Sequence, residues 1–105
     1  MPTETAPLGR FTDPAVLIMS SLADGDKHGW ALIKDIEAFA DVALGPGTLY
    51  GALSRLEDRG LVEALPAQDR RRPYRLTATG AQALHGYLSH ARMVADTGLR
   101  RLAQA

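Results

Sequence analysis

The sequence predicts a mainly α-helical fold with one small β-hairpin, in a chain of 105 residues that suffices for one domain. Residues 13–60 contain three stretches in which apolar side chains recur every three or four positions, separated by Gly, Pro and Asp signals. Two short apolar segments then flank a polar turn within residues 61–76, which is typical of a hairpin. From residue 77 onward the helical spacing resumes and continues to the end.

The first helix is predicted to begin at Asp13 and Pro14 and to end at Asp24-Gly25. Aspartate is a good N-cap acceptor, and proline in the first helical position has no amide hydrogen to lose. Most side chains between these ends are apolar, so we expect this helix to lie at the centre of the core. Residues 1–12 show no periodic apolar pattern and are predicted to form a flexible tail.

Residues 26–29 are predicted to form a turn, and a second helix is predicted from about Trp30 to Ala40. Its apolar residues recur at three- to four-residue spacing and are expected to face the core. They are Trp30, Ile33, Ile36 (or Glu37) and Ala40. The residues expected mainly on the solvent side are Lys34, Asp35 and Glu37.

A third helix is predicted between Pro46 and Gly60, because proline suits the first helical turn and glycine the left-handed position after the last one. One stripe of this helix is apolar and is expected to point inward. It consists of Leu49, Leu53 and Leu56, with Ala52 beside them. The opposite stripe is polar, with small side chains near its N-terminal end. It consists of Gly47, Thr48, Gly51, Ser54, Arg55 and Asp58.

Residues 61–65 and 72–76 are predicted to form two strands, with the polar segment 66–71 as the turn between them. A hairpin this small is not stable on its own, so it must rest on the helices. The end of the turn and the first residue of the second strand carry three consecutive arginines, Arg70, Arg71 and Arg72.

Thr77 is a candidate N-cap for a last helix that reaches the end of the chain. An apolar stripe runs along this helix and extends about four turns past the part that can pack on the hairpin domain. The stripe consists of Leu84, Leu88, Ala91, Ala95 and Leu102, with Tyr87 and Val94 nearby. Gly80, Gly86 and Gly98 each weaken the helix by roughly 1 kcal/mol relative to alanine. A long and intrinsically weak helix with such a stripe usually has a partner surface, so the five stripe residues are predicted to form a dimer interface.

The predicted order of three helices, strand, basic turn, strand and helix is the layout of a winged helix-turn-helix. It divides the chain into a tail at residues 1–12, a DNA-binding domain at residues 13–77 and a dimerisation helix at residues 78–105. In that fold the third helix enters the major groove of duplex DNA, and the hairpin turn touches the adjacent backbone or minor groove. The predicted DNA-binding residues are Gly47, Thr48, Tyr50, Gly51, Ser54, Arg55, Arg70, Arg71 and Arg72.

The chemistry of these residues suits that role. Glycines on the outward stripe let the helix backbone approach the bases, and Arg55 can pair bidentately with guanine. Consecutive arginines suit phosphates or a narrow minor groove. Each residue also has an ordinary structural explanation, since Arg55 could pair with Asp58, Tyr50 could pack in the core and the arginine turn could be a solvated loop. The prediction therefore depends on the whole arrangement.

Four segments of the chain resemble the PadR family of bacterial transcriptional regulators. They are HGW at 28–30, GPGTLY at 45–50, LSRLEDRGLV at 53–62 and RRPYRLTATG at 71–80, and the resemblance covers about residues 14–88. It implies a dimer, usually a repressor, held together by the C-terminal helix, and it implies that Thr48 and Tyr50 meet DNA. Gly45 stands where the family often has a hydroxyl residue, and Trp30 where tyrosine is common. The short last helix resembles the compact branch of the family, but it lacks the tryptophan with which some members bind flat aromatic drugs.

Several other classes of function are not expected from this sequence. There is no cysteine, which excludes disulfides, thiolate zinc sites and cysteine nucleophiles. His85 and His90 are five residues apart and fall on different helix faces, so neither a metal site nor a catalytic or cofactor site is predicted. No apolar run approaches membrane-spanning length, and a cytoplasmic location is the default expectation.

The charge distribution leaves two kinds of partner open. The net charge is zero, but residues 1–44 carry three basic and seven acidic groups, whereas residues 45–77 carry six and four. The expected partners are duplex DNA, a second copy of the chain and an effector of unknown chemistry. The alternative is a winged-helix module that binds protein instead of DNA, which the net neutrality and the acidic N-terminal half keep open.

Overall fold

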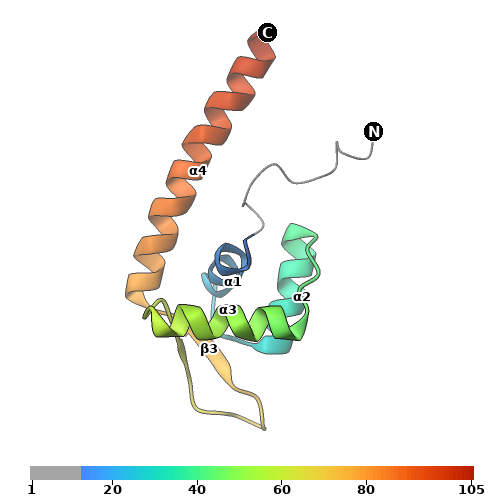
Figure 1. Cartoon of the computed structure of the whole chain (residues 1–105), viewed down its shortest axis with the longest axis vertical. Coiled ribbons are helices and arrows are strands. Elements are labelled where there is room, and N and C mark those ends of the chain that lie inside the picture. Colours follow the sequence, from blue (N-terminus) through green and yellow to red (C-terminus); the bar gives the residue numbers. More distant parts are fainter. Residues whose placement is uncertain (1–12) are drawn as a thin grey trace.

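The computed structural model describes residues 13–105, and the tail predicted for residues 1–12 lies outside this range. The elements of the described chain are α1 (Pro14–Leu22), β1 (Lys27–His28), α2 (Gly29–Ala40), α3 (Pro46–Asp58), β2 (Val62–Ala64), β3 (Pro73–Leu76) and α4 (Ala78–Gln104). The first three helices and the small sheet pack into one body, from which α4 projects (Figure 1). The predicted mainly helical fold with a small hairpin is confirmed, as are the caps that Asp13 and Thr77 provide for α1 and α4.

The sheet has three antiparallel strands in the order β1-β3-β2, one more than the sequence predicts. The prediction of a turn at residues 26–29 is wrong in part. Lys27 pairs with Tyr74 and His28 with Pro73, so these two residues form a strand on the side of β3 opposite β2. Two residues are too few to carry a strand pattern, so this strand results from main-chain pairing that only the folded chain provides. The pairing places His28 next to the hairpin.

The core lies between α1, α2, α3 and the inner side of the sheet. The predicted α3 stripe is confirmed, since Leu49, Ala52, Leu53 and Leu56 are each 2% exposed or less. For α2 the prediction is wrong about Trp30, whose side chain is 63% exposed and lies against the Lys34 ammonium. The helix starts at Gly29, and burial of Gly29, Leu32 and Ile36 turns Trp30 toward solvent.

A polar cluster ties β1 to the first two helices. Ser21 is 2% exposed, and its hydroxyl donates to the Asp35 carboxylate. The Lys27 ammonium donates to the Ser21 carbonyl oxygen and to the Asp24 carboxylate, and this hydrogen bond holds the pKa of Asp24 below its ordinary value. Each buried polar atom therefore has a partner, and the strand that carries His28 is anchored at its first residue.

The junction between β3 and α4 consists of Thr77 alone. The Thr77 side-chain oxygen accepts the Gly80 N–H at 2.9 Å and lies 2.7 Å from the Gly60 carbonyl oxygen, to which it donates. Gly60 has φ +74°, the left-handed conformation that the sequence predicts after α3. The first turn of α4 thus rests directly on the chain that enters β2.

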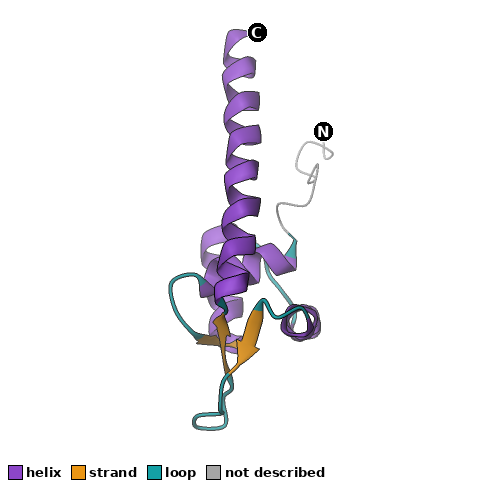
Figure 2. Cartoon of the chain, turned by 90° about the vertical axis from the view of Figure 1, so that its left-hand side faces the viewer, coloured by secondary structure: helices purple, strands orange, loops and turns teal. Residues whose placement is uncertain are grey.

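Beyond its first two turns, α4 is in contact with little of the chain. Its buried residues are Gly80 and Leu84. The whole helix is about 40 Å long, and the part beyond Leu84 extends away from the rest of the molecule (Figure 2). The exposed large apolar side chains of this helix are Tyr87, Leu88, Met93, Val94, Leu99 and Leu102. All of these except Met93 continue the helix face that Leu84 buries. Within residues 13–105 no helix is long and apolar enough to cross a membrane.

Candidate nucleic-acid interface

The outward side of α3 is open to solvent in this chain. Gly47, Thr48, Ser54 and Arg55 are exposed, Tyr50 is 49% exposed and Gly51 is half-buried. The N-cap residue of α3 is Gly45, which has no side chain that could accept a hydrogen bond from the first amide groups of this helix. The same helix therefore buries a leucine face and presents a face of small, hydroxyl and guanidinium groups.

Tyr50 lies on the flank of α3 that faces the start of α2. A Cβ atom built on Gly29 would lie 2.1 Å from the Tyr50 hydroxyl oxygen, so the Tyr50 side chain occupies the space that any larger residue would need. The requirement for glycine at position 29 of the HGW segment thus has a structural reason that the sequence alone does not reveal. Tyr50 is also close to Tyr74. Burial is the main cause that raises the pKa of the Tyr74 phenol, and the nearness of Tyr50 and Glu57 adds to it.

Arg55 lies on the other flank of α3, away from the hairpin. It lines a hollow with Asp13, Pro14 and Arg59, and its Nη1 atom lies 3.5 Å from where a Cβ atom on Gly51 would be. Among residues 13–105, the ion pairs within 4.0 Å are Lys27–Asp24, Lys27–Asp35 and Arg75–Glu63. The alternative pairing of Arg55 with Asp58 is therefore not formed.

The tip of the hairpin is a tight two-residue turn. Asp69 and Arg70 have φ of +50° and +65°, and Gln68 and Arg71 exchange two backbone hydrogen bonds of 2.7 and 2.8 Å. These values are typical of a type I′ turn, which matches the twist of the flanking strands. The sequence does not reveal it, because Asp-Arg is not one of the Asn-Gly or Asp-Gly pairs that normally mark such a turn. The turn leaves Arg70, Arg71 and Arg72 exposed.

The arginine turn and Tyr50 lie beside one another. Together with His28, Gly29 and Trp30 they line a hollow of about 200 Å³ that joins the hairpin tip to the N-terminal half of α3. Arg72 donates to the Leu65 carbonyl oxygen at 3.3 Å, and Arg71 lies 3.4 Å from His28 Nε2. At the base of the hairpin Arg75 pairs with Glu63 across the sheet and adds no free charge. The sequence missed His28 and Trp30 as neighbours of the turn, because their contact depends on β1.

Of the predicted dimerisation residues, Leu84 is 5% exposed and lies in the core of its own chain. The other four are half-buried or exposed, including Leu88 at 41% and Leu102 at 73%.

In residues 13–105 no group of three or more His, Cys, Asp and Glu side chains could hold a metal ion.

Comparison with known proteins gives a family match and several similar structures. Residues 18–86 match the family model described as "Transcriptional regulator PadR-like family". A PadR family transcription regulator from Clostridium difficile superposes with a TM-score of 0.77 at 25% identity, covering 90% of this chain and 99% of that one. A transcriptional regulator from Clostridium thermocellum has a TM-score of 0.71 at 26% identity, covering 83% and 87%.

A curated relative extends beyond the matched region. It is an uncharacterized 37.1 kDa protein in transposon TN4556 of Streptomyces fradiae, 45% identical to this chain over 75 residues. The match covers 71% of this chain and 22% of that protein. The chain therefore spans less than a quarter of the length of this relative.

Proposed function

The chain belongs to the PadR-like family of transcriptional regulators, and from this premise we propose that it binds specific sites on duplex DNA as a homodimer and represses transcription. The observation that supports the proposal best is the outward side of α3. Small and hydroxyl side chains and Arg55 are exposed there, next to a hairpin tip with three arginines. A regulator of this kind acts in the cytoplasm and performs no catalysis.

In the proposed complex α3 reads the major groove. Gly47 and Gly51 allow the helix backbone to come close to the DNA, and Thr48 and Ser54 bond to phosphates or base edges. Arg55 reaches a guanine from one flank of the helix, where no acid within residues 13–105 holds it. Tyr50 directs its hydroxyl to a phosphate from the other flank. Base recognition and backbone contact are thereby divided between the two sides of one helix.

The hairpin supplies the second contact. Its three arginines follow the exposed tip and lie on the Tyr50 side of α3, so they can neutralise phosphates that flank the recognised bases. In the proposed homodimer the exposed stripe of α4 forms the interface. Two recognition helices then meet successive major grooves about 34 Å apart.

The proposal is tested by fluorescence anisotropy with host-genome fragments that the protein selects, titrated at several salt concentrations. We expect tight binding to selected fragments, weak binding to unrelated DNA and an affinity that falls steeply as salt rises. A folded protein that binds none of the DNA fragments, or that co-purifies with another protein and does not bind DNA, would support the protein-binding alternative instead.

Replacing Arg55 by alanine should lower the affinity for the selected site by about 1–3 kcal/mol and relax the preference at one base pair. Arg55 is the side chain of α3 best suited to a bidentate guanine contact. The measurement is anisotropy with the selected site and with each single-base variant of it. The control is Arg59→Ala, which removes the same charge from the end of α3. It should lower the affinity for all DNA sequences by the same factor. An equal effect of both variants on base preference would contradict the assignment.

Replacing Arg71 by alanine should reduce the slope of log affinity against log salt by about 1, because one phosphate contact is lost. The base preference should stay as it is. Arg75→Ala is the matched control, since Arg75 is already paired with Glu63, and its slope should equal that of the unmodified protein. If Arg71→Ala changes base preference but not the slope, the hairpin does not contact the backbone as proposed.

A further inference from the structure

Trp30 is the only tryptophan of the chain, and its side chain is 63% exposed. Single exposed aromatic side chains are common on protein surfaces, so the exposure of Trp30 does not by itself identify a site. An indole combines a large apolar ring with one N–H group, which can donate a hydrogen bond but cannot accept one. The surface on which Trp30 lies is what indicates a role for it.

That surface is basic. Trp30 and Tyr50 line the hollow of about 200 Å³ beside the hairpin tip, together with Arg70, Arg71 and Arg72. Among residues 13–105, those that line this hollow include no acid. The Lys34 ammonium, one turn further along α2, lies 5.4 Å from the centre of the Trp30 ring. Four cationic groups near one aromatic ring are typical of a surface that binds a polyanion.

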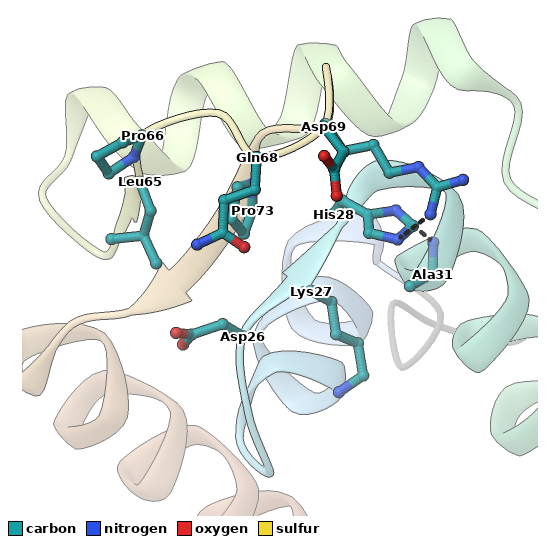
Figure 3. A pocket seen from close by; sticks show the side chains of 10 residues that line it. Asp26, Lys27, His28, Ala31, Leu65, Pro66, Gln68, Asp69 and Pro73 are labelled. Carbon is teal, nitrogen blue, oxygen red and sulfur yellow. Dashed lines mark hydrogen bonds between the residues drawn. The ribbon is translucent and has the colours of Figure 1, made fainter.

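The hairpin tip and the start of α2 are joined by contacts on both sides of this hollow. Figure 3 shows the His28 ring between them: its Nδ1 atom caps α2, and its Nε2 atom lies 3.4 Å from Arg71 Nη1. On the side of α3, Tyr50 fills the space that a side chain at Gly29 would need. Trp30 follows directly after Gly29, so it has a fixed place between the hairpin arginines and α3.

We propose that Trp30 binds the phosphodiester backbone of the DNA that α3 recognises. The indole N–H donates to a phosphate oxygen, and the ring lies against the adjoining sugar. This inference rests on the proposed function, in which Tyr50 contacts a phosphate from the same hollow. The two aromatic residues then hold neighbouring phosphates of one strand, which fixes the orientation of α3 in the major groove without reading any base.

A contact through a neutral N–H group differs measurably from one through arginine. The salt dependence of DNA affinity reflects the cationic groups that replace counterions, and Trp30 carries no charge. Loss of the Trp30 contact should therefore lower the affinity by the same factor at every salt concentration, whereas Arg71→Ala also changes the slope. The base preference should stay as it is, because phosphates carry no sequence information.

The first experiment uses the unmodified full chain, in which Trp30 is the single source of tryptophan fluorescence. Quenching of this fluorescence by acrylamide is measured alone, with unrelated duplex DNA and with the selected site. We expect saturating DNA to lower the quenching constant about twofold or more, because the backbone covers the indole. DNA that binds but leaves the quenching constant unchanged would overturn the inference. Shielding that rises with protein concentration and not with DNA would overturn it too, since a second copy of the chain would then cover Trp30.

Variants separate the N–H group from the ring. Trp30→Phe keeps an aromatic ring and should lower the affinity for selected and unrelated DNA about tenfold or more, the effect of losing a hydrogen bond to a charged group. Trp30→Ala removes the ring as well and should lower the affinity further. Phe39→Ala is the matched control, because Phe39 is 52% exposed on the opposite side of α2 and does not line the hollow. Its affinity should stay within about twofold of the unmodified protein.

The salt series separates a failure of this inference from a failure of the proposed function. Trp30→Phe should show the slope and the base preference of the unmodified protein. A change in either would mean that Trp30 acts through the arginines or through α3, and would overturn the direct contact. If both Trp30 variants bind DNA as the unmodified protein does, the contact is wrong and the proposed function stands. If the folded unmodified protein binds no DNA, both fail.

Discussion

Replacing Gly80 by alanine should destabilise the protein by about 3 kcal/mol, the upper end for an added methyl group in a packed contact. A Cβ atom there would lie 2.0 Å from the Leu61 carbonyl oxygen and 2.8 Å from Leu76 Cδ1. The oxygen belongs to the backbone and also accepts the Thr77 N–H, so it cannot move aside without opening the junction with α4. The measurement is thermal unfolding at a fixed protein concentration, where this loss corresponds to roughly 12–24 °C.

Gly86→Ala is the matched control for this prediction. Gly86 lies in the same helix, and nothing is within 4 Å of where its Cβ atom would be. Alanine should therefore stabilise α4 by about 0.5–1 kcal/mol through its helix propensity. The two variants make the same chemical change and are expected to shift the melting temperature in opposite directions. A melting temperature for Gly80→Ala equal to that of Gly86→Ala would show that the close contact at Leu61 does not exist in solution.

Replacing Ala95 by aspartate should separate the proposed homodimer into monomers. Ala95 is exposed in the single chain and belongs to the apolar stripe of α4, so the charge leaves the fold of the chain intact. In the dimer the same charge would be buried against a second apolar helix without a partner. A monomer engages one half-site, so its affinity for the full site should fall roughly 10²–10⁴-fold. Light scattering after size exclusion and anisotropy with the selected DNA measure the two effects.

Met93→Asp controls for the effect of an aspartate in α4 itself. Met93 is 58% exposed and lies almost opposite Ala95 on the helix, so the two variants place the same charge on different faces. Met93→Asp should remain dimeric and retain its DNA affinity. Dimers in both variants, or monomers in both, would show that the stripe does not define the interface.

The sequence predicts the helices of this fold well, because their signals are local. The caps at Asp13 and Thr77, Pro46 at the start of α3 and the buried stripe of α3 depend on a few residues in a row, and the structure and the family match confirm the winged helix that they indicate. Strand β1 and the exposure of Trp30 depend on contacts between distant segments. No local pattern contains that information.

Part of the candidate site could be predicted in the same way. Helical periodicity alone predicts that Thr48 and Arg55 point away from the core, and both are exposed. The sequence treats Gly80 only as a weak point of α4, whereas the structure uses it for a close approach to Leu61. The meeting of His28 with Arg71 joins residues 43 positions apart, and it required the sheet to be known.

The junction at Thr77 has a mechanical consequence for the proposed dimer. Since a single residue, the N-cap Thr77, separates β3 from α4, the hairpin and the long helix turn as one rigid unit, without a flexible hinge. The crossing angle of two such units, and not the reach of a linker, then dictates how far apart the two halves of an operator must lie. A molecule wedged between the helices would reset that spacing while touching no recognition residue.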